Sequence, residues 1–265
     1  MGYGVGWRIP GKLPLGKGKL SGTPAGDNWL VPSLSARPCA LLRAFATMPS
    51  PAPAARIHLV RHGDVAAPWD ERIYGSMDVP LSKLGQQQSR GLARALEARP
   101  LAAVISSGLS RSDFLARLVA RQTGLAIRVE DRLKELDRGD WAGWDQEQVD
   151  SADPGAWGRF WASGGVFDVP GGEPLAQLQT RVVSALEDLA GEFGGQEILV
   201  VAHKWVLRAA LCTVLGMPME HSPRLHVPHL GKVSLDWAVG GGRRLVCLSW
   251  EPLGGWLGGS GVSRS

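Results

Sequence analysis

Two histidines in the sequence each stand directly after a short apolar run. Residues 57–60 lead into Arg61 and His62, and residues 198–202 lead into His203. Each run has the length and composition of a buried strand. Open α/β sheets bind ligands at the carboxyl edge of their strands, so two neighbouring strands of this kind would bring both imidazoles to one site. Taken alone, a histidine at the end of a strand is usually structural.

A second arginine follows another strand-like run. Residues 101–106 are followed by Arg111, at the start of an expected helix. The backbone N–H groups at a helix N-terminus bind anions, and a guanidinium donates two hydrogen bonds in one plane. Arg61 and Arg111 together therefore suit a phosphoryl group, which an imidazole could attack.

Strands and helices alternate along the chain. Strands are expected over residues 56–60, 101–106, 126–129, 198–202, 233–237 and 245–249, and helices over 82–99, 111–123, 174–192 and 207–215. This order predicts an α/β fold of three layers, with a mostly parallel central sheet and helices on both faces. Residues 133–172 hold four tryptophans and are expected to be irregular, either a lid over a pocket or a satellite core.

Residues 56–250 are expected to form one domain, because no repeat or boundary interrupts them. Residues 1–55 are rich in glycine and proline and show no helical or strand period. We expect a disordered extension there; the alternatives are a targeting segment within 1–47, with organellar import, and a true translation start at Met48. Residues 251–265 are expected to be a flexible tail.

Charge and cysteine content narrow the class of protein. Six of the 29 basic residues but only one of the 25 acidic residues lie in residues 1–50, so the body of the chain is nearly neutral. That balance gives no electrostatic case for nucleic-acid binding. Three isolated cysteines, Cys39, Cys212 and Cys247, suit a reducing, cytoplasmic compartment. No apolar run approaches the ~18 residues of a membrane span.

Five motifs stand in order between residues 56 and 215. They are Leu59-Val60-Arg61-His62-Gly63 with Gly75-x-x-Asp78-x-Pro80-Leu81-Ser82-x-x-Gly85, then Ser107-x-Leu109-x-Arg111, Leu133-Lys134-Glu135-Leu136-Asp137-x-Gly139-Asp140-Trp141-x-Gly143, Pro170-Gly171-Gly172-Glu173 and Val200-Val201-Ala202-His203. Together they resemble the histidine phosphatase (phosphoglycerate mutase-like) superfamily. Any one of them is a weak signal, whereas five in register are a strong one.

The resemblance implies a phosphoglycerate mutase-like fold and a set of roles. His62 would attack phosphorus and carry a phosphohistidine. Arg61, Arg111 and His203 would hold the transferring oxygens, and Glu135 would act as general acid and then general base. No metal and no cofactor are implied.

Other residues are assigned less directly. Asp137, Asp140 and Glu173 are rivals for the general acid, and the match to the acid motif favours Glu135. Substrate contacts are also expected from Gly63, Tyr74 and Lys204. Lys204 replaces a common glycine of the family, and its side chain either enters the pocket or points away along its helix.

Three histidines near the C-terminal end, His221, His226 and His229, raise the question of a metal site. Pro223 and Pro228 lie among them, and no cysteine or carboxylate stands at ligand spacing. A surface loop is therefore the favoured interpretation.

Asp64 stands where the family often has glutamate, and we expect it to orient the site.

The predicted function is a cofactor-independent phosphomonoesterase acting on a small phosphorylated metabolite. The region from Tyr74 to Leu81 is compact and resembles the phosphatase branch, which includes α-ribazole phosphatases, and the chain lacks the extra basic segments of the mutases. The alternatives are mutase-type phosphoryl transfer and a catalytically weak module that binds phosphate or a protein. The oligomeric state stays open, a homodimer included.

Overall fold

The computed structural model describes residues 53–249. The expected extension or targeting segment and the expected C-terminal tail lie outside the described residues. One sheet has the strand order β3-β2-β4-β1-β5-β6. Its strands are β1 (Ala55–Arg61), β2 (Leu101–Ser106), β3 (Ile127–Val129), β4 (Glu197–Ala202), β5 (Lys232–Trp237) and β6 (Arg243–Ser249).

The first four strands run parallel, and the last two form an antiparallel hairpin beside them. β4 lies between β2 and β1 and pairs with both in parallel, while β5 pairs antiparallel with β1 and with β6. The glycines at 240–242 lie between β5 and β6. A sheet covered on both faces needs apolar side chains on both sides of its strands. β1 provides them, because Ile57 and Leu59 belong to one core cluster and Val60 to the other.

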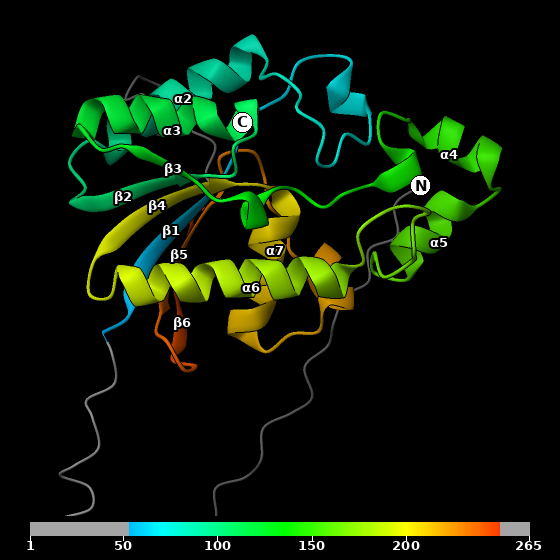
Figure 1. The fold of residues 1–265 in the computed structure, drawn as a ribbon. Coiled ribbons are helices and arrows are strands. Elements are labelled where there is room, and N and C mark those ends of the chain that lie inside the picture. The colour runs from blue at the N-terminus through cyan, green and yellow to red at the C-terminus, as the bar shows by residue number, and fades with distance from the viewer. Residues whose placement is uncertain (1–52, 250–265) are drawn as a thin grey trace, which may run out of the picture. The chain divides into compact units, whose positions relative to one another are not determined.

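Two pairs of helices cover the two faces (Figure 1). Helices α2 (Lys83–Leu96) and α3 (Ser110–Thr123) pack over one core, and α6 (Leu175–Glu192) and α7 (Lys204–Leu215) over the other. The predicted three-layer α/β fold is confirmed.

The helix ends follow the local chemistry of the sequence. The Ser82 hydroxyl accepts a hydrogen bond from the Gly85 N–H at 2.9 Å and caps α2. Gly124 and Gly216 end α3 and α7 in the left-handed region, with φ of 74° and 61°. Pro174 lies immediately before α6 rather than in its first turn.

The expectation of an irregular segment over residues 133–172 is wrong in part. That segment contains the helices α4 (Gln146–Ala152) and α5 (Ala156–Ala162), beside 3-10 turns at Asp131–Leu133 and Gly139–Trp141. Asp145 and Gln148 form a complete capping box at the start of α4. Figure 1 shows α4 and α5 beside the sheet rather than over either face.

Two further 3-10 turns complete the described chain, at Trp69–Glu71 and at Met219–Arg224. The second leads into the segment that returns to the sheet as β5. Within residues 53–249, no helix has both the length and the apolar character that crossing a membrane requires.

Candidate active site

His62 and His203 meet at the carboxyl edge of the sheet, because β1 and β4 are parallel neighbours. Arg61 pairs with Ala202, and the His62 N–H donates to the Ala202 carbonyl at 3.0 Å. The two imidazole centroids are 5.2 Å apart, and both side chains are fully buried. The juxtaposition expected from the two apolar runs is therefore present.

The hydrogen bonds of His62 leave one ring nitrogen free. Its Nδ1 lies 2.7 Å from the Gly63 carbonyl, which only accepts, so Nδ1 carries the proton. Its Nε2 is buried and has no hydrogen-bond partner among the described residues. Burial lowers the pKa of His62 well below its ordinary value, and the nearby His203, Arg61 and Arg111 lower it further. The imidazole is thus neutral, with an available lone pair on Nε2.

Gly63 serves this arrangement through its backbone. A Cβ at this position would lie 2.6 Å from the Gly85 carbonyl oxygen, so a larger residue would push β1 away from the start of α2. Gly63 does not line the cavity of the site. Its carbonyl holds the His62 ring, and a contact between Gly63 and substrate stays a prediction.

Arg111 lies fully buried at the start of α3. Its two Nη atoms donate to the carbonyls of Met77 at 2.5 Å and Gly75 at 2.7 Å, and its guanidinium carbon lies 5.1 Å from the centre of the Tyr74 ring. Burial lowers its pKa, although arginine stays charged. The Nε2 of His203 lies 2.7 Å from the Ser107 hydroxyl, in the turn before α3.

Arg61 is held by the segment that precedes β5. One Nη atom donates to the Val227 carbonyl and the other lies against Nε2 of His229, each at 2.7 Å. Asp64 completes the set: its carboxylate lies 3.6 Å from Nδ1 of His229 and accepts from the Ser82 hydroxyl at 2.6 Å. Asp64 thus contacts both His229 and Ser82, and its role in orienting the site stays a prediction.

The interpretation of His229 as a surface-loop residue is wrong. It lines the cavity, 5.5 Å from His62 between ring centroids, whereas His226 is exposed. Burial and the charge of Arg61 lower the pKa of His229 to about 4. The physical reason is the antiparallel return of β5 along β1, which brings Leu230 against Arg61. In residues 53–249, no three His, Cys, Asp or Glu side chains are grouped as metal ligands.

Glu135 is the carboxylate that the fold directs into the site. It is 6% exposed, and its Oε1 accepts from the backbone N–H groups of Leu136 at 2.9 Å and Trp205 at 3.2 Å. Its three rivals lie elsewhere. Glu173 forms a two-pronged ion pair with Arg181 at 2.6 and 2.7 Å, and the remaining two, Asp137 and Asp140, are exposed.

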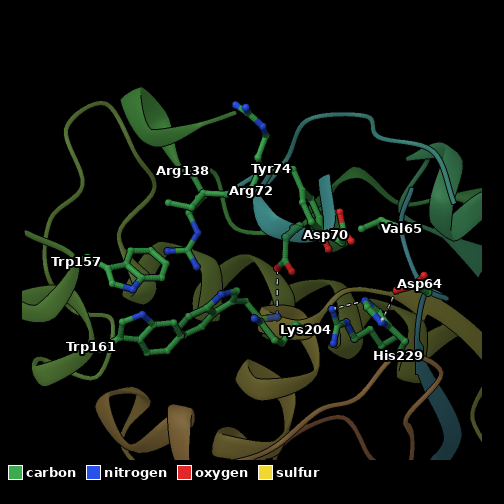
Figure 2. Close-up of a pocket in the computed structure, with 15 residues that line it drawn as sticks. Asp64, Val65, Asp70, Arg72, Tyr74, Arg138, Trp157, Trp161, Lys204 and His229 are labelled. Carbon is green, nitrogen blue, oxygen red and sulfur yellow. Dashed lines mark hydrogen bonds and ion pairs between the residues drawn. The ribbon is translucent and has the colours of Figure 1, made fainter. Parts of the chain in front are cut away.

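A cavity of about 300 Å³ opens onto these groups (Figure 2). Its walls include Arg61, Tyr74, Glu135, Lys204 and His229. The three fully buried residues pack behind this lining: His62, Arg111 and His203. The Lys204 side chain faces the cavity rather than pointing away along α7, and burial lowers its pKa to about 8.

The tryptophans of residues 133–172, expected either over a pocket or in a satellite core, are found in two different places. Trp141 is buried in the core, where its ring stacks on Phe167. Trp157 and Trp161, on α5, line the cavity. The segment therefore supplies a wall of the pocket and part of the main core on the α6 and α7 side, rather than a separate satellite core.

The chain is similar to several known proteins. It is 31% identical over 185 residues to a probable phosphoglycerate mutase, GpmB, of an Enterobacter species, covering 69% of this chain and 85% of the relative. It is 31% identical over 180 residues to the glucosyl-3-phosphoglycerate phosphatase of Mycobacterium tuberculosis, covering 65% and 80%. The crystal structure of the α-ribazole phosphatase from Shigella flexneri superposes with a TM-score of 0.66 at 25% identity, covering 73% and 95%.

A sequence model of the histidine phosphatase superfamily (branch 1) matches residues 57–250. That range contains all five motifs and every side chain of the site described above. The resemblance drawn from the motifs is confirmed, and the chain belongs to the histidine phosphatase superfamily, branch 1.

Proposed function

We propose that this protein is a phosphomonoesterase that hydrolyses a small phosphorylated metabolite through a phosphohistidine on His62. The observation that carries the proposal is the state of His62: a neutral imidazole whose Nε2 is free, with Arg61, Arg111 and His203 around it. The predicted class, a phosphoric monoester hydrolase, agrees with the phosphatases among its relatives.

In the first step, Arg61, Arg111 and His203 hold the nonbridging oxygens of the phosphoryl group and stabilise the charge that grows on them. Nε2 of His62 forms a bond to phosphorus as the bond from phosphorus to the ester oxygen breaks. Glu135, in its protonated form, gives its proton to the leaving oxygen. The products of this step are a phosphohistidine, a free alcohol and a carboxylate at Glu135.

In the second step, a water molecule attacks the phosphohistidine. Glu135 takes a proton from this water, the bond between nitrogen and phosphorus breaks, and phosphate leaves. The enzyme returns to its starting state, with neutral His62 and protonated Glu135. Tyr74 and Lys204, which line the cavity, are proposed as substrate contacts.

A mutase would share the first step and differ in the second, because the phosphoryl group would return to an alcohol. Its support is the likeness to a probable phosphoglycerate mutase. The chain between Glu135 and His203 lacks the extra basic segments that the resemblance associates with mutases, which favours hydrolysis. The product distinguishes the two reactions: free phosphate or an isomerised phosphoester.

The experiment is turnover of an aryl phosphate by the wild type, His62→Ala and His226→Ala. We expect His62→Ala to lose activity by a factor of ~10³ or more while keeping its circular-dichroism spectrum. His226 is exposed and is not among the residues that line the cavity, so its variant controls for the loss of an imidazole. Equal rates for wild type and His62→Ala would overturn the proposal.

The proposed compartment is the cytoplasm. Cys212 and Cys247 are both free thiols in the structure, which agrees with a reducing environment. The proposed partner is the small phosphorylated substrate itself.

A further inference from the structure

Lys204 and Arg138 take no part in the proposed bond-making and bond-breaking steps, although Lys204 is already proposed as a substrate contact. Lys204 stands at the first position of α7, directly after His203, and Arg138 stands three residues after Glu135. Both line the cavity. Figure 2 shows Arg138, Trp157 and Trp161 on one side of the cavity, with Lys204 between them and His229.

Arg138 is buried, and Lys204 is half-buried. Arg138 is 9% exposed, and its guanidinium carbon lies 4.8 Å from the ring centre of Phe160 and 5.1 Å from that of Trp205. Burial is the first cause that lowers the pKa of Arg138, to about 10, and that of Lys204, to about 8. Keeping a cation in such a place costs free energy unless an anion or a hydrogen-bond acceptor compensates.

Few of the described residues offset the free-energy cost of holding these two cations. Glu135 is the one carboxylate among them whose charge acts on either cation, and it acts at a distance rather than through a hydrogen bond. One carboxylate thus acts on one buried and one half-buried cation, and in the proposed reaction it is protonated when substrate binds. Asp64 and Asp70 also line the cavity, but neither is among the charges that act on the two cations. The end of the cavity at Lys204 and Arg138 therefore retains positive charge when Glu135 is protonated.

The position of the two cations assigns them to one part of the substrate. Glu135 acts on the oxygen of the leaving alcohol in the proposed mechanism, and its charge acts on both Lys204 and Arg138, which line the same cavity. The phosphoryl group lies farther in, at His62 and Arg111, which are fully buried. Lys204 and Arg138 thus lie along the alcohol portion, next to the flat wall of Trp157 and Trp161.

We propose that Lys204 and Arg138 form a second anion-binding subsite, so that the preferred substrates are phosphomonoesters whose alcohol portion carries a carboxylate or a second phosphate. The carbon skeleton between the two anionic groups packs against Trp157 and Trp161. This inference rests on the proposed function and names its substrate class. A carboxylate and a phosphate present the same acceptor oxygens to the two cations, and the substrates tested distinguish them.

The test compares kcat/KM for three esters of matched length, measured by phosphate release: propyl phosphate, 2-carboxyethyl phosphate and propane-1,3-diyl bisphosphate. We expect the wild type to prefer at least one of the two charged esters over propyl phosphate by about 10- to 100-fold, the range of a charge-assisted hydrogen bond. The ester with the larger preference identifies the second anion.

Lys204→Met and Arg138→Gln should each reduce this preference by about tenfold or more. Lys83→Met is the matched control, because Lys83 is exposed at the start of α2 and its loss removes the same charge from the protein; its preference should equal that of the wild type. If Arg138→Gln folds poorly, Lys204→Met carries the test by itself. A wild type without preference, or a Lys204→Met variant that slows all three esters equally, would overturn the proposal.

Calorimetric titration with propylphosphonate and 2-carboxyethylphosphonate separates this proposal from the proposed function, since neither compound turns over. Tighter binding of the carboxylated compound by the wild type, lost in Lys204→Met, supports the subsite even if no ester is hydrolysed. Equal binding of the two compounds, combined with normal hydrolysis of the aryl phosphate, would overturn the subsite and leave the phosphatase standing.

Discussion

The imidazole of His229 lies against the guanidinium of Arg61, with 2.7 Å between Nε2 and an Nη atom. A guanidinium only donates, so Nε2 of His229 accepts and its proton is on Nδ1, toward Asp64 at 3.6 Å. A neutral histidine thus supports the arginine that is proposed to hold the phosphoryl group. Protonation of this imidazole would remove the acceptor and place two cations in contact.

His229→Ala is expected to lower kcat/KM for an aryl phosphate by about 10- to 100-fold, because Arg61 loses one of the two contacts that orient it. His229→Asn offers an acceptor at a similar place and should recover part of the loss. His226→Ala, in the same segment but exposed, should match the wild type. If His229→Ala also matches the wild type, His229 does not position Arg61.

Glu135→Gln should slow the enzyme according to the leaving group. An alkyl oxide needs a proton to leave and an aryl oxide hardly does, so alkyl esters should lose about 10²- to 10⁴-fold and a nitrophenyl ester much less in the phosphorylation step. Burst kinetics with the nitrophenyl ester isolate that step from the hydrolysis of the phosphohistidine. Asp140→Asn, with an exposed side chain, is the control. Equal slowing of both phosphorylation steps would exclude Glu135 as the acid.

Glu173 is expected to stabilise the fold and to help place Glu135, because it holds Arg181. Arg181, which it holds, also donates to the carbonyls of Arg132 at 2.6 Å and Lys134 at 2.7 Å. Glu173→Gln should therefore lower the free energy of unfolding by about 1–3 kcal/mol, measured by urea denaturation. The control is Glu192→Gln, whose ion pair with Arg128 is exposed and should contribute less than about 1 kcal/mol. Equal losses in the two variants would contradict this role.

Much of the fold could be predicted from the sequence because it depends on local patterns. The buried stripe of α6, from Leu175 to Leu189, has helical spacing, and the central strands are apolar on both faces. The helices α4 and α5 were missed because each is only seven residues long, and the aromatic residues of α5 hide its period. One signal was available: Asp145 and Gln148 have the spacing of a capping box.

Site residues that belong to a sequence motif could be predicted. Residues that reach the site only through contacts between distant parts of the chain could not. Arg61, His62 and His203 follow strands whose pairing brings them together. His229 enters the site only because β5 returns along β1, and nothing near it in sequence indicates that path. The direction of the Lys204 side chain depends likewise on the space left by Arg61 and Glu135.

Stability should depend on pH through the buried histidines. Burial lowers the pKa values of His62 and His203, and lowers that of His229 to about 4. In the unfolded chain these histidines bind protons near pH 6.5, whereas in the folded chain they stay neutral at that pH. The free energy of unfolding should therefore decrease as pH falls from about 7 to 5. Urea unfolding across this range measures the slope. His229→Asn should reduce it, and an unchanged slope would contradict the neutral, buried state of His229.

The central claim is a phosphoryl group carried by His62. The most direct measurement mixes the wild type with a ³²P-labelled phosphoester, quenches the mixture in base within milliseconds, and maps the labelled peptide by mass spectrometry. The account predicts a base-stable, acid-labile label on His62, and none in His62→Ala. Label on His203 instead, or turnover with no label on any histidine, would contradict it.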